Sequence, residues 1–274
     1  MRIDIGDTPK KNSDEHLDSE SGQPDCAPRT RLPAFGFGAH AIVVLTYLIG
    51  GVSMLVWLVF LFHGSFNLVN LGLSEVASLG LNTCLCLAFF IQHSTMIRRS
   101  FRHWLAKFIG TDYHGAVFTI ASGVVLLILV VFWQKSAHLL TSPQGLLRWL
   151  LRTVFFLSIV GFNWGTRALG SFDPFGLSPI LNSMRGTEPP PPMPFIVRGP
   201  YRWIRHPLYF FCLLMIWSCP DLSLDRLVHN VLWTAWIVVG SVLEERDLVA
   251  SFGEEYSNYK RKVPMLIPWR IPLA

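Results

Sequence analysis

The sequence predicts an all-α, polytopic membrane protein with about five to six transmembrane helices, a C-terminal helical hairpin and an interfacial helix. Three observations support this fold class. Hydrophobic residues make up 51% of the 274 positions and charged residues only 15%, whereas about a quarter of a typical soluble domain is charged. The mean hydropathy is +0.41. Several uncharged apolar runs are also long enough to cross the hydrocarbon core of a bilayer, which is about 30 Å thick, as helices.

Residues 1–34 are predicted to form a disordered polar tail ahead of one membrane-embedded domain at 35–274. The tail is rich in Asp, Glu, Ser, Lys and Pro, so it cannot bury enough apolar surface to fold alone. It also lacks the apolar core of a signal peptide.

The apolar runs place the membrane segments along the chain. The first three are uncharged, and each approaches the length of a spanning helix. The fourth is the least regular, because its stretch reaches back over two arginines. A polar turn at 220–226 separates the last two, which are therefore expected to form the hairpin. The six runs are Ala41–Phe62, Val76–Ile91, Ala116–Trp133, Phe155–Trp164, Leu208–Cys219 and Val228–Leu243.

Basic residues alternate between the expected loops. Lys and Arg are frequent before the first run and after the second, fourth and sixth, and they are rare in the other loops. By the positive-inside rule, both termini are predicted to face the cytoplasm. Arg148 and Arg152 depart from this pattern, and their long side chains are expected to snorkel to the interface. Each basic cluster adjoins a membrane segment, so the net charge of +5 does not indicate nucleic-acid binding.

Several chemistries have no support in the sequence. The five cysteines form no Cys-x-x-Cys pair, and we interpret them as small apolar filler. No Walker motif, no Gly-x-Gly-x-x-Gly fingerprint and no zinc signature occurs. Phosphoryl transfer, a Rossmann domain and a resident metal are therefore not predicted.

The segment from Arg198 to Tyr209, which follows a run of four prolines, is the first candidate for chemistry. Pro207 suits the first turn of the fifth apolar helix, which places Arg205 and His206 beside free backbone N–H groups. A helix N-terminus with adjacent cations is an anion site. The alternative is a basic and aromatic anchor at the membrane surface.

A second candidate follows the sixth apolar run, where Glu244, Glu245 and Asp247 lie close to hydrocarbon. Acids in such positions are costly and are functional candidates by default. The hairpin returns this end to the depth of Arg205 and His206, so acidic and basic groups are expected to converge. The alternative is that the acids are solvated beyond the helix end.

Two further segments are weaker candidates. Phe252, Tyr256, Tyr259 and Val263 follow helical spacing, which predicts an amphipathic helix that covers the site or serves as a plain interfacial anchor. The polar triplet Gln92-His93-Ser94 ends the second run. It either lines a pocket or caps the helix.

These segments together carry a family resemblance. The order of motifs resembles the C-terminal core of the membrane methyltransferases, which include isoprenylcysteine carboxyl methyltransferase and the phospholipid methyltransferases. A wider set is similar to methanethiol S-methyltransferase and the NnrU-like group. The matching motifs are Gln92-His93-Ser94-x-Met96, Phe172-Asp173-x-Phe175-Gly176-Leu177, Arg205-His206-Pro207-Leu208-Tyr209, Glu244-Glu245-Arg246-Asp247 and Val263-Pro264. Two departures, at Gly170-Ser171 and Tyr113-His114, bear on the acceptor more than on the methyl donor.

The resemblance implies S-adenosyl-L-methionine as the methyl donor, bound at the cytoplasmic mouth. Its carboxylate suits Arg205 and His206, and its amino group and ribose hydroxyls suit Glu244 or Glu245. Tyr209 and Tyr256 are candidates for contact with the sulfonium.

For the acceptor, the resemblance implies a small thiol, most simply methanethiol giving dimethyl sulfide. The thiolate is the nucleophile, and His206, His93 and Glu245 are the possible bases. An isoprenylcysteine or phospholipid acceptor entering from membrane lipid, a sterol-reductase-like enzyme and a non-catalytic NnrU-like protein are the alternatives. The sequence leaves the oligomeric state open.

Overall fold

The computed structural model describes residues 37–170, 172–187 and 195–270. The predicted disordered tail and the run of four prolines lie outside these residues. As predicted, the secondary structure is almost entirely helical. The helices in chain order are α1 (Phe37–His63), α2 (Glu75–Ile97), α3 (Arg99–Leu105), α4 (His114–Phe132), α5 (Gly145–Ala168), α6 (Ser178–Arg185), α7 (Pro207–Trp217) and α8 (Leu224–Lys262), with single 3₁₀ turns at Thr111–Tyr113 and Gly199–Arg202.

Five helices within the described residues are long and apolar enough to span a membrane, namely α1, α2, α4, α5 and α8. The least regular predicted run is therefore a full helix, α5, of 24 residues. The fifth run forms α7, which has only 11 residues and a length of about 16 Å, roughly half of the hydrocarbon thickness. The six predicted segments are therefore five helices of spanning length and one short apolar helix. After α7 the chain still reaches the other end of the bundle, where Leu222–Ser223 pairs with Leu139–Thr141.

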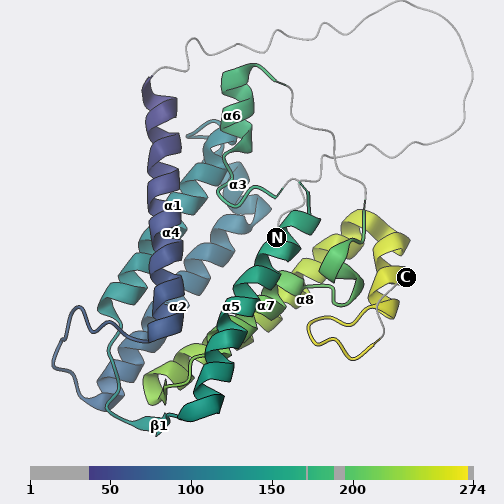
Figure 1. The fold of residues 1–274 in the computed structure, drawn as a ribbon. Helices are drawn as coiled ribbons and strands as arrows, with labels where there is room; N and C mark the ends of the chain where they lie inside the picture. The colour runs from purple at the N-terminus through teal and green to yellow at the C-terminus, as the bar shows by residue number, and fades with distance from the viewer. Residues whose placement is uncertain (1–36, 171, 188–194, 271–274) are drawn as a thin grey trace, which may run out of the picture.

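The helices form two groups that meet along α8 (Figure 1). Helix α1 packs along α4, α2 packs against both α4 and α8, and α5 packs against α7. Aromatic rings fill the space where these helices meet, including those of Trp57, Phe60, Trp133 and Trp233. Large rings suit this core because they bury much apolar surface for each side chain.

Two glycines on α5 set the position of α7. A Cβ at Gly161 would lie 2.2 Å from the ring of Phe211, and one at Gly165 would lie 2.7 Å from Leu208. Small residues let helices in membranes approach closely. Because Phe211 and Leu208 belong to α7, these glycines fix the helix that begins at Pro207, as the sequence predicts.

The predicted polar turn at 220–226 is shorter than expected. Leu222–Ser223 forms β2, which pairs antiparallel with β1 (Leu139–Thr141), and α8 already begins at Leu224. Asp225 and Arg226 are each only 2% exposed. Burial of these charged side chains is tolerated because both form hydrogen bonds, which offset the cost of leaving water.

The bonds to these two residues close the base-poor end of the bundle. Asp225 accepts hydrogen bonds from Trp133 Nε1 at 2.8 Å and from the Ser136 N–H at 3.1 Å. Arg226 donates to the carbonyls of Phe60, at 2.8 Å, and Leu61. It thereby adds donors to carbonyls in the last turn of α1, where the Phe60 carbonyl also accepts from the Gly64 N–H at 2.8 Å.

The two arginines of α5 that depart from the charge pattern, Arg148 and Arg152, both have partners in other segments. Arg148 forms a two-point ion pair with Asp221, at 2.9 and 2.7 Å, which lowers the pKa of that carboxyl. Arg152 donates to the carbonyl of Phe62 and lies 3.8 Å from the centre of its ring. Interhelical pairing therefore explains both departures from the charge pattern.

Candidate functional site

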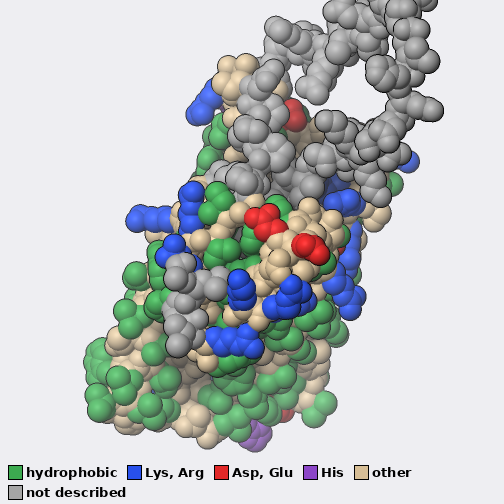
Figure 2. Space-filling view, turned by 90° about the vertical axis from the view of Figure 1, so that its right-hand side faces the viewer, with side chains coloured by type: hydrophobic (Ala, Val, Ile, Leu, Met, Phe, Trp, Pro, Cys, Tyr) green, Lys and Arg blue, Asp and Glu red, His purple; other side chains and the backbone are tan. Residues whose placement is uncertain are grey.

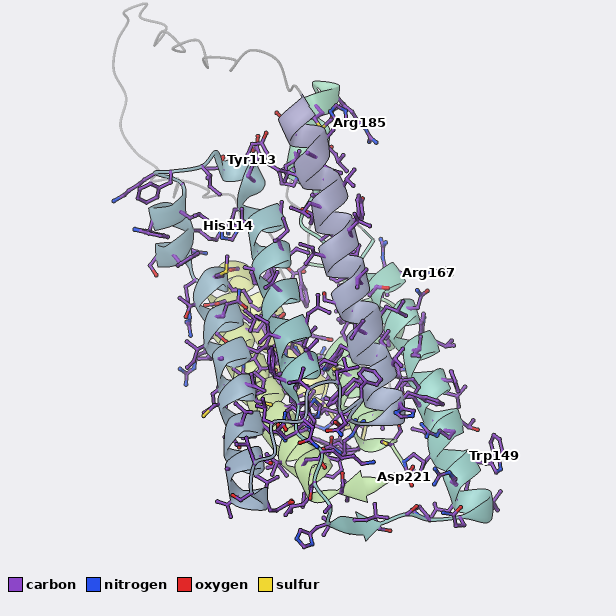
Figure 3. All side chains as sticks on the ribbon, turned by 90° about the vertical axis from the view of Figure 1, so that its left-hand side faces the viewer. Tyr113, His114, Trp149, Arg167, Arg185 and Asp221 are labelled. Carbon is purple, nitrogen blue, oxygen red and sulfur yellow. The ribbon has the colours of Figure 1, made fainter. Side chains whose placement is uncertain are left out.

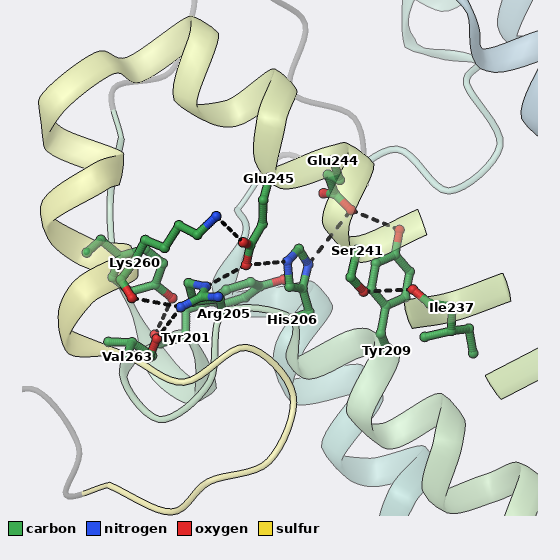
Figure 4. Close-up of polar contacts among 11 residues, drawn as sticks. Tyr201, Arg205, His206, Tyr209, Ile237, Ser241, Glu244, Glu245, Lys260 and Val263 are labelled. Carbon is green, nitrogen blue, oxygen red and sulfur yellow. Dashed lines mark hydrogen bonds and ion pairs between the residues drawn. The ribbon is translucent and has the colours of Figure 1, made fainter. Parts of the chain in front are cut away.

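The candidate site lies where the start of α7 meets the later part of α8 (Figure 4). Pro207 occupies the first turn of α7, so Arg205 and His206 immediately precede the helix. Helix α8 carries Glu244 and Glu245 and then bends at Gly253, where φ is 57° and ψ is −126°. The bend brings Lys260 and Val263 back over Glu245 and Arg205. The sequence predicted this convergence of acidic and basic groups, and the structure shows it.

Glu245 is the centre of an ion-pair network. Its Oε1 lies 2.6 Å from Arg205 Nε and 3.3 Å from His206 Nε2, and its Oε2 lies 2.8 Å from Lys260 Nζ. The side chain is only 4% exposed. Both carboxylate oxygens therefore already have cationic or imidazole partners, which offset the cost of burying the charge.

Arg205 is fixed by the C-terminal segment as well as by Glu245. Its NH1 group donates to the carbonyls of Lys260, at 2.8 Å, and Val263, at 2.5 Å. The backbone N–H groups of Arg205 and His206 donate to the carbonyls of Pro264 and Met265, at 2.9 and 3.1 Å. These two N–H groups are therefore used by the chain itself.

Glu244 differs from its neighbour. Its Oε2 accepts a hydrogen bond from Tyr209 OH at 2.9 Å and lies 3.8 Å from His206 Nδ1. Its Oε1 is buried and has no hydrogen-bond partner within the described structure. A buried acceptor left without a partner costs about 1–3 kcal/mol. The arrangement therefore favours a ligand that offers an ammonium or hydroxyl group to Glu244.

The end of α8 covers this site. Tyr256, Tyr259 and Val263 lie on one face, as their spacing predicts, and they are 2%, 6% and 2% exposed. They pack against Phe195 and Val197, so protein covers this face and the segment is not a plain membrane anchor. Tyr259 OH also donates to the Tyr201 carbonyl at 2.6 Å, which ties this segment to the turn before α7.

The polar triplet of α2 packs against Trp236 of α8, eight residues before Glu244, and does not cap the helix. The C-cap of α2 is Arg98. His93 lies among Phe89, Phe118 and Trp236, with ring centres 5.3, 4.9 and 5.3 Å away, and its Nδ1 is buried without a partner in the described structure.

The neighbours of His93 also face inward. Gln92 donates to Ser122 at 3.3 Å, and Ser94 accepts from Trp236 Nε1 at 3.2 Å. A cavity of about 390 Å³ borders Ser94, and its lining comes from Phe90, Ile91, Ser94, Thr95, Arg98 and Ser100.

The Phe-Asp element before α6 is not part of either site. Phe175 packs on Tyr47 of α1, with ring centres 5.2 Å apart, and its carbonyl accepts from Thr119 of α4 at 2.9 Å. Asp173 accepts from the N–H of Ser178 at 2.6 Å at the start of α6. Tyr113 and His114 lie at the same end of the bundle (Figure 3). These residues hold α6 against α1 and α4.

The sequence did not identify Lys260 as a site residue. It stands in a run of basic residues that the membrane-surface charge pattern already explains. Only the bend at Gly253 shows that its ammonium returns to Glu245, which is 15 positions earlier in the chain. Helical spacing alone gives no signal for this contact.

The comparisons with known proteins agree with the predicted family. The chain matches the family described as NnrU protein over residues 82–257. It is 35% identical to methanethiol S-methyltransferase 2 of Bradyrhizobium diazoefficiens over 187 residues, which cover 68% of this chain and 72% of that protein. It is 36% identical to methanethiol S-methyltransferase of a Pseudomonas species over 190 residues, or 66% of this chain and 70% of that protein.

More distant similarity extends to an animal protein. Nurim of Mus musculus is 25% identical over 193 residues, which cover 64% of this chain and 70% of Nurim. No solved structure shows a significant match to the chain. The family match spans more than half of the chain and includes Arg205, His206, Tyr209, Glu244 and Glu245. The chain is therefore a multi-pass membrane protein that belongs to the NnrU protein family, among relatives named as methyltransferases.

Proposed function

We propose that this protein is an S-adenosylmethionine-dependent thiol S-methyltransferase that converts methanethiol to dimethyl sulfide. The observation that carries the proposal is the 33–36% identity to several relatives named methanethiol S-methyltransferase. The geometry of the α7–α8 site supports it, because the free oxygen of Glu244 suits a ligand with an ammonium or hydroxyl group.

The residues of the α7–α8 site fit the donor. Glu244 Oε1 accepts from the donor's ammonium or ribose hydroxyls, while Tyr209 fixes the other oxygen of the same carboxylate. Arg205 and Glu245 hold the start of α7 and the end of α8 together around it. Tyr209 and Tyr256 offer aromatic faces, which attract cations. When bound, S-adenosylmethionine supplies a methyl group that its sulfonium already activates.

The three candidate bases differ in their surroundings. Glu245 Oε1 and Oε2 are both engaged, and His206 lies between Glu244 and Glu245 with its ring stacked on Tyr209 at 5.5 Å. His93 keeps a buried Nδ1 without a partner. We therefore propose that His93 Nδ1 is the base that accepts the proton of the thiol. The resulting thiolate would take the methyl group that bound S-adenosylmethionine supplies, with S-adenosylhomocysteine as the leaving group.

The surroundings of His93 suit a small sulfur compound. Phe89, Phe118 and Trp236 surround its ring, and sulfur makes favourable contacts with aromatic rings. An apolar wall also leaves the thiolate poorly solvated, so it remains reactive. The enzyme's main contribution is then the alignment of the two reactants.

The test is headspace analysis of cells that express the protein and are fed methanethiol. We expect dimethyl sulfide well above the vector control, and its loss in the Glu244→Gln variant at equal expression. If no dimethyl sulfide forms while the purified protein binds S-adenosylmethionine, the thiol assignment is wrong. Methylation of a prenylcysteine or a phospholipid in a parallel assay would then identify the acceptor class.

A further inference from the structure

The cations of the α7–α8 site differ in how firmly they are held. Arg205 is 9% exposed, and it has Glu245 and the carbonyls of Lys260 and Val263 as partners. Lys260 is 46% exposed, and the contact of its ammonium is with Glu245 Oε2 at 2.8 Å. A half-exposed lysine on a flexible stem exchanges partners far more easily than a buried arginine with several.

The amino-acid end of S-adenosylmethionine is a zwitterion with an ammonium and a carboxylate on one carbon. Glu244 and Glu245 offer negative charge to the ammonium. The carboxylate needs a cation, and Arg205 is already committed to Glu245 and to the C-terminal segment. The backbone N–H groups of Arg205 and His206 are also bonded to Pro264 and Met265. Lys260 is the cation at this site that can turn toward a carboxylate without breaking the packed core.

We propose that Lys260 is the carboxylate-binding residue for the methyl donor and that it works by exchange of ion pairs. In the structure, Lys260 Nζ forms an ion pair with Glu245 Oε2 (Figure 4). The donor's ammonium takes the place of Lys260 on Glu245, and the released lysine binds the donor's carboxylate. This inference rests on the proposed function, because it concerns the same donor.

The exchange keeps every charge paired. Before it, Glu245 has the cations Arg205 and Lys260 as partners. After it, Glu245 has Arg205 and the donor's ammonium, and Lys260 has the donor's carboxylate. A buried carboxylate therefore never loses both cations, which would be strongly destabilising. Lys260 also lies beyond the bend at Gly253, so the exchange ties the end of α8 to the bound donor.

Equilibrium binding to the purified full chain tests the proposal with two ligands. One is S-adenosylmethionine, and the other is decarboxylated S-adenosylmethionine, which keeps the ammonium but lacks the carboxylate. We expect the Lys260→Gln variant to bind S-adenosylmethionine about tenfold more weakly, as the loss of one charge-assisted hydrogen bond predicts. The same variant should bind the decarboxylated ligand as well as the wild type does, or better, because no lysine competes for Glu245.

Two control variants give each outcome a meaning. Lys262→Gln removes a neighbouring charge without this contact and should leave both affinities unchanged. Lys260→Arg keeps the charge and should retain the preference for the carboxylate. If Lys260 has a purely structural role, Lys260→Gln should weaken the binding of both ligands equally. That result, or an unchanged ratio of the two affinities, overturns the proposal. If the wild type binds neither ligand, the proposed function itself fails, and this inference fails with it.

Discussion

Two adjacent acids have different surroundings in this protein. Consecutive side chains on a helix point about 100° apart, so Glu245 faces Arg205 and Lys260 while Glu244 faces Tyr209. Glu245 has partners on both oxygens, and Glu244 keeps one buried oxygen without a partner in the described structure. We infer that Glu245 holds the site together and receives the donor's ammonium, and that Glu244 contacts the donor through its free oxygen.

Conservative substitutions at the two acids should separate these roles. Glu244→Gln should weaken binding of S-adenosylhomocysteine, the product of the donor, about tenfold or more, with little change in the melting temperature in detergent. Glu245→Gln should lower the melting temperature as well, because Arg205 and Lys260 lose their shared counter-ion. Binding isotherms and thermal melts of both variants provide the measurement. Equal effects of the two substitutions on both quantities would contradict the division of roles.

At the scale of elements, the bend in α8 decides whether the site exists. Residues before Gly253 belong to the helix that crosses the bundle, and residues after it carry Tyr256, Tyr259 and Lys260. With φ at 57° and ψ at −126°, Gly253 occupies a region that residues with a Cβ do not tolerate. A straight helix would carry Lys260 away from Glu245. The glycine is therefore a structural requirement of the site.

Gly253→Ala should disrupt the bend. We expect weaker donor binding and earlier proteolytic cleavage between 253 and 262, since the cost of the strained backbone is of order 1–3 kcal/mol. Gly240→Ala is the matched control on the same helix, because its Cβ would meet nothing within 4 Å and its φ is ordinary. That variant should behave as the wild type or melt slightly higher. A Gly253→Ala variant with normal binding and normal protease resistance would show that the bend does not hold the site.

At the scale of the whole molecule, charge divides the protein into two ends. Lys and Arg side chains gather across one part of the surface, beside a largely hydrophobic region (Figure 2). Arg167 and Arg185 lie toward one end and Asp221 toward the other (Figure 3). The basic loops expected from the sequence therefore share one end with the α7–α8 site, which suits a polar donor that arrives from the aqueous phase.

This division predicts the orientation of the protein in the membrane. We expect both termini and the α7–α8 site to face the cytoplasm, because the basic end should remain inside. Reporters inserted at Ser100, near the start of α3, and at Gln144, just before α5, should report opposite sides of the membrane. Identical signals would contradict this topology. A reversed pair, with Ser100 outside, would place the donor site on the wrong side for a cytosolic ligand.

The sequence by itself determined the membrane class, the order of the long helices and the convergence of four residues of the candidate site. Long apolar runs and the spacing of residues along one helix are local properties, so they can be read without knowing what lies opposite. That is why Pro207 marked the start of α7 correctly, and why Arg205, His206, Glu244 and Glu245 were expected together.

Only the tertiary structure decided the features that depend on contacts between distant segments. Arg226 was assigned to a polar turn but is buried, where it donates to the carbonyls of Phe60 and Leu61, and Arg148 pairs with Asp221. Lys260 belongs to the site because one positive φ at Gly253 reverses the chain. The sequence shows the type of a charged residue but not whether its side chain lies in water or beside a buried partner. Only the fold shows which partner it has.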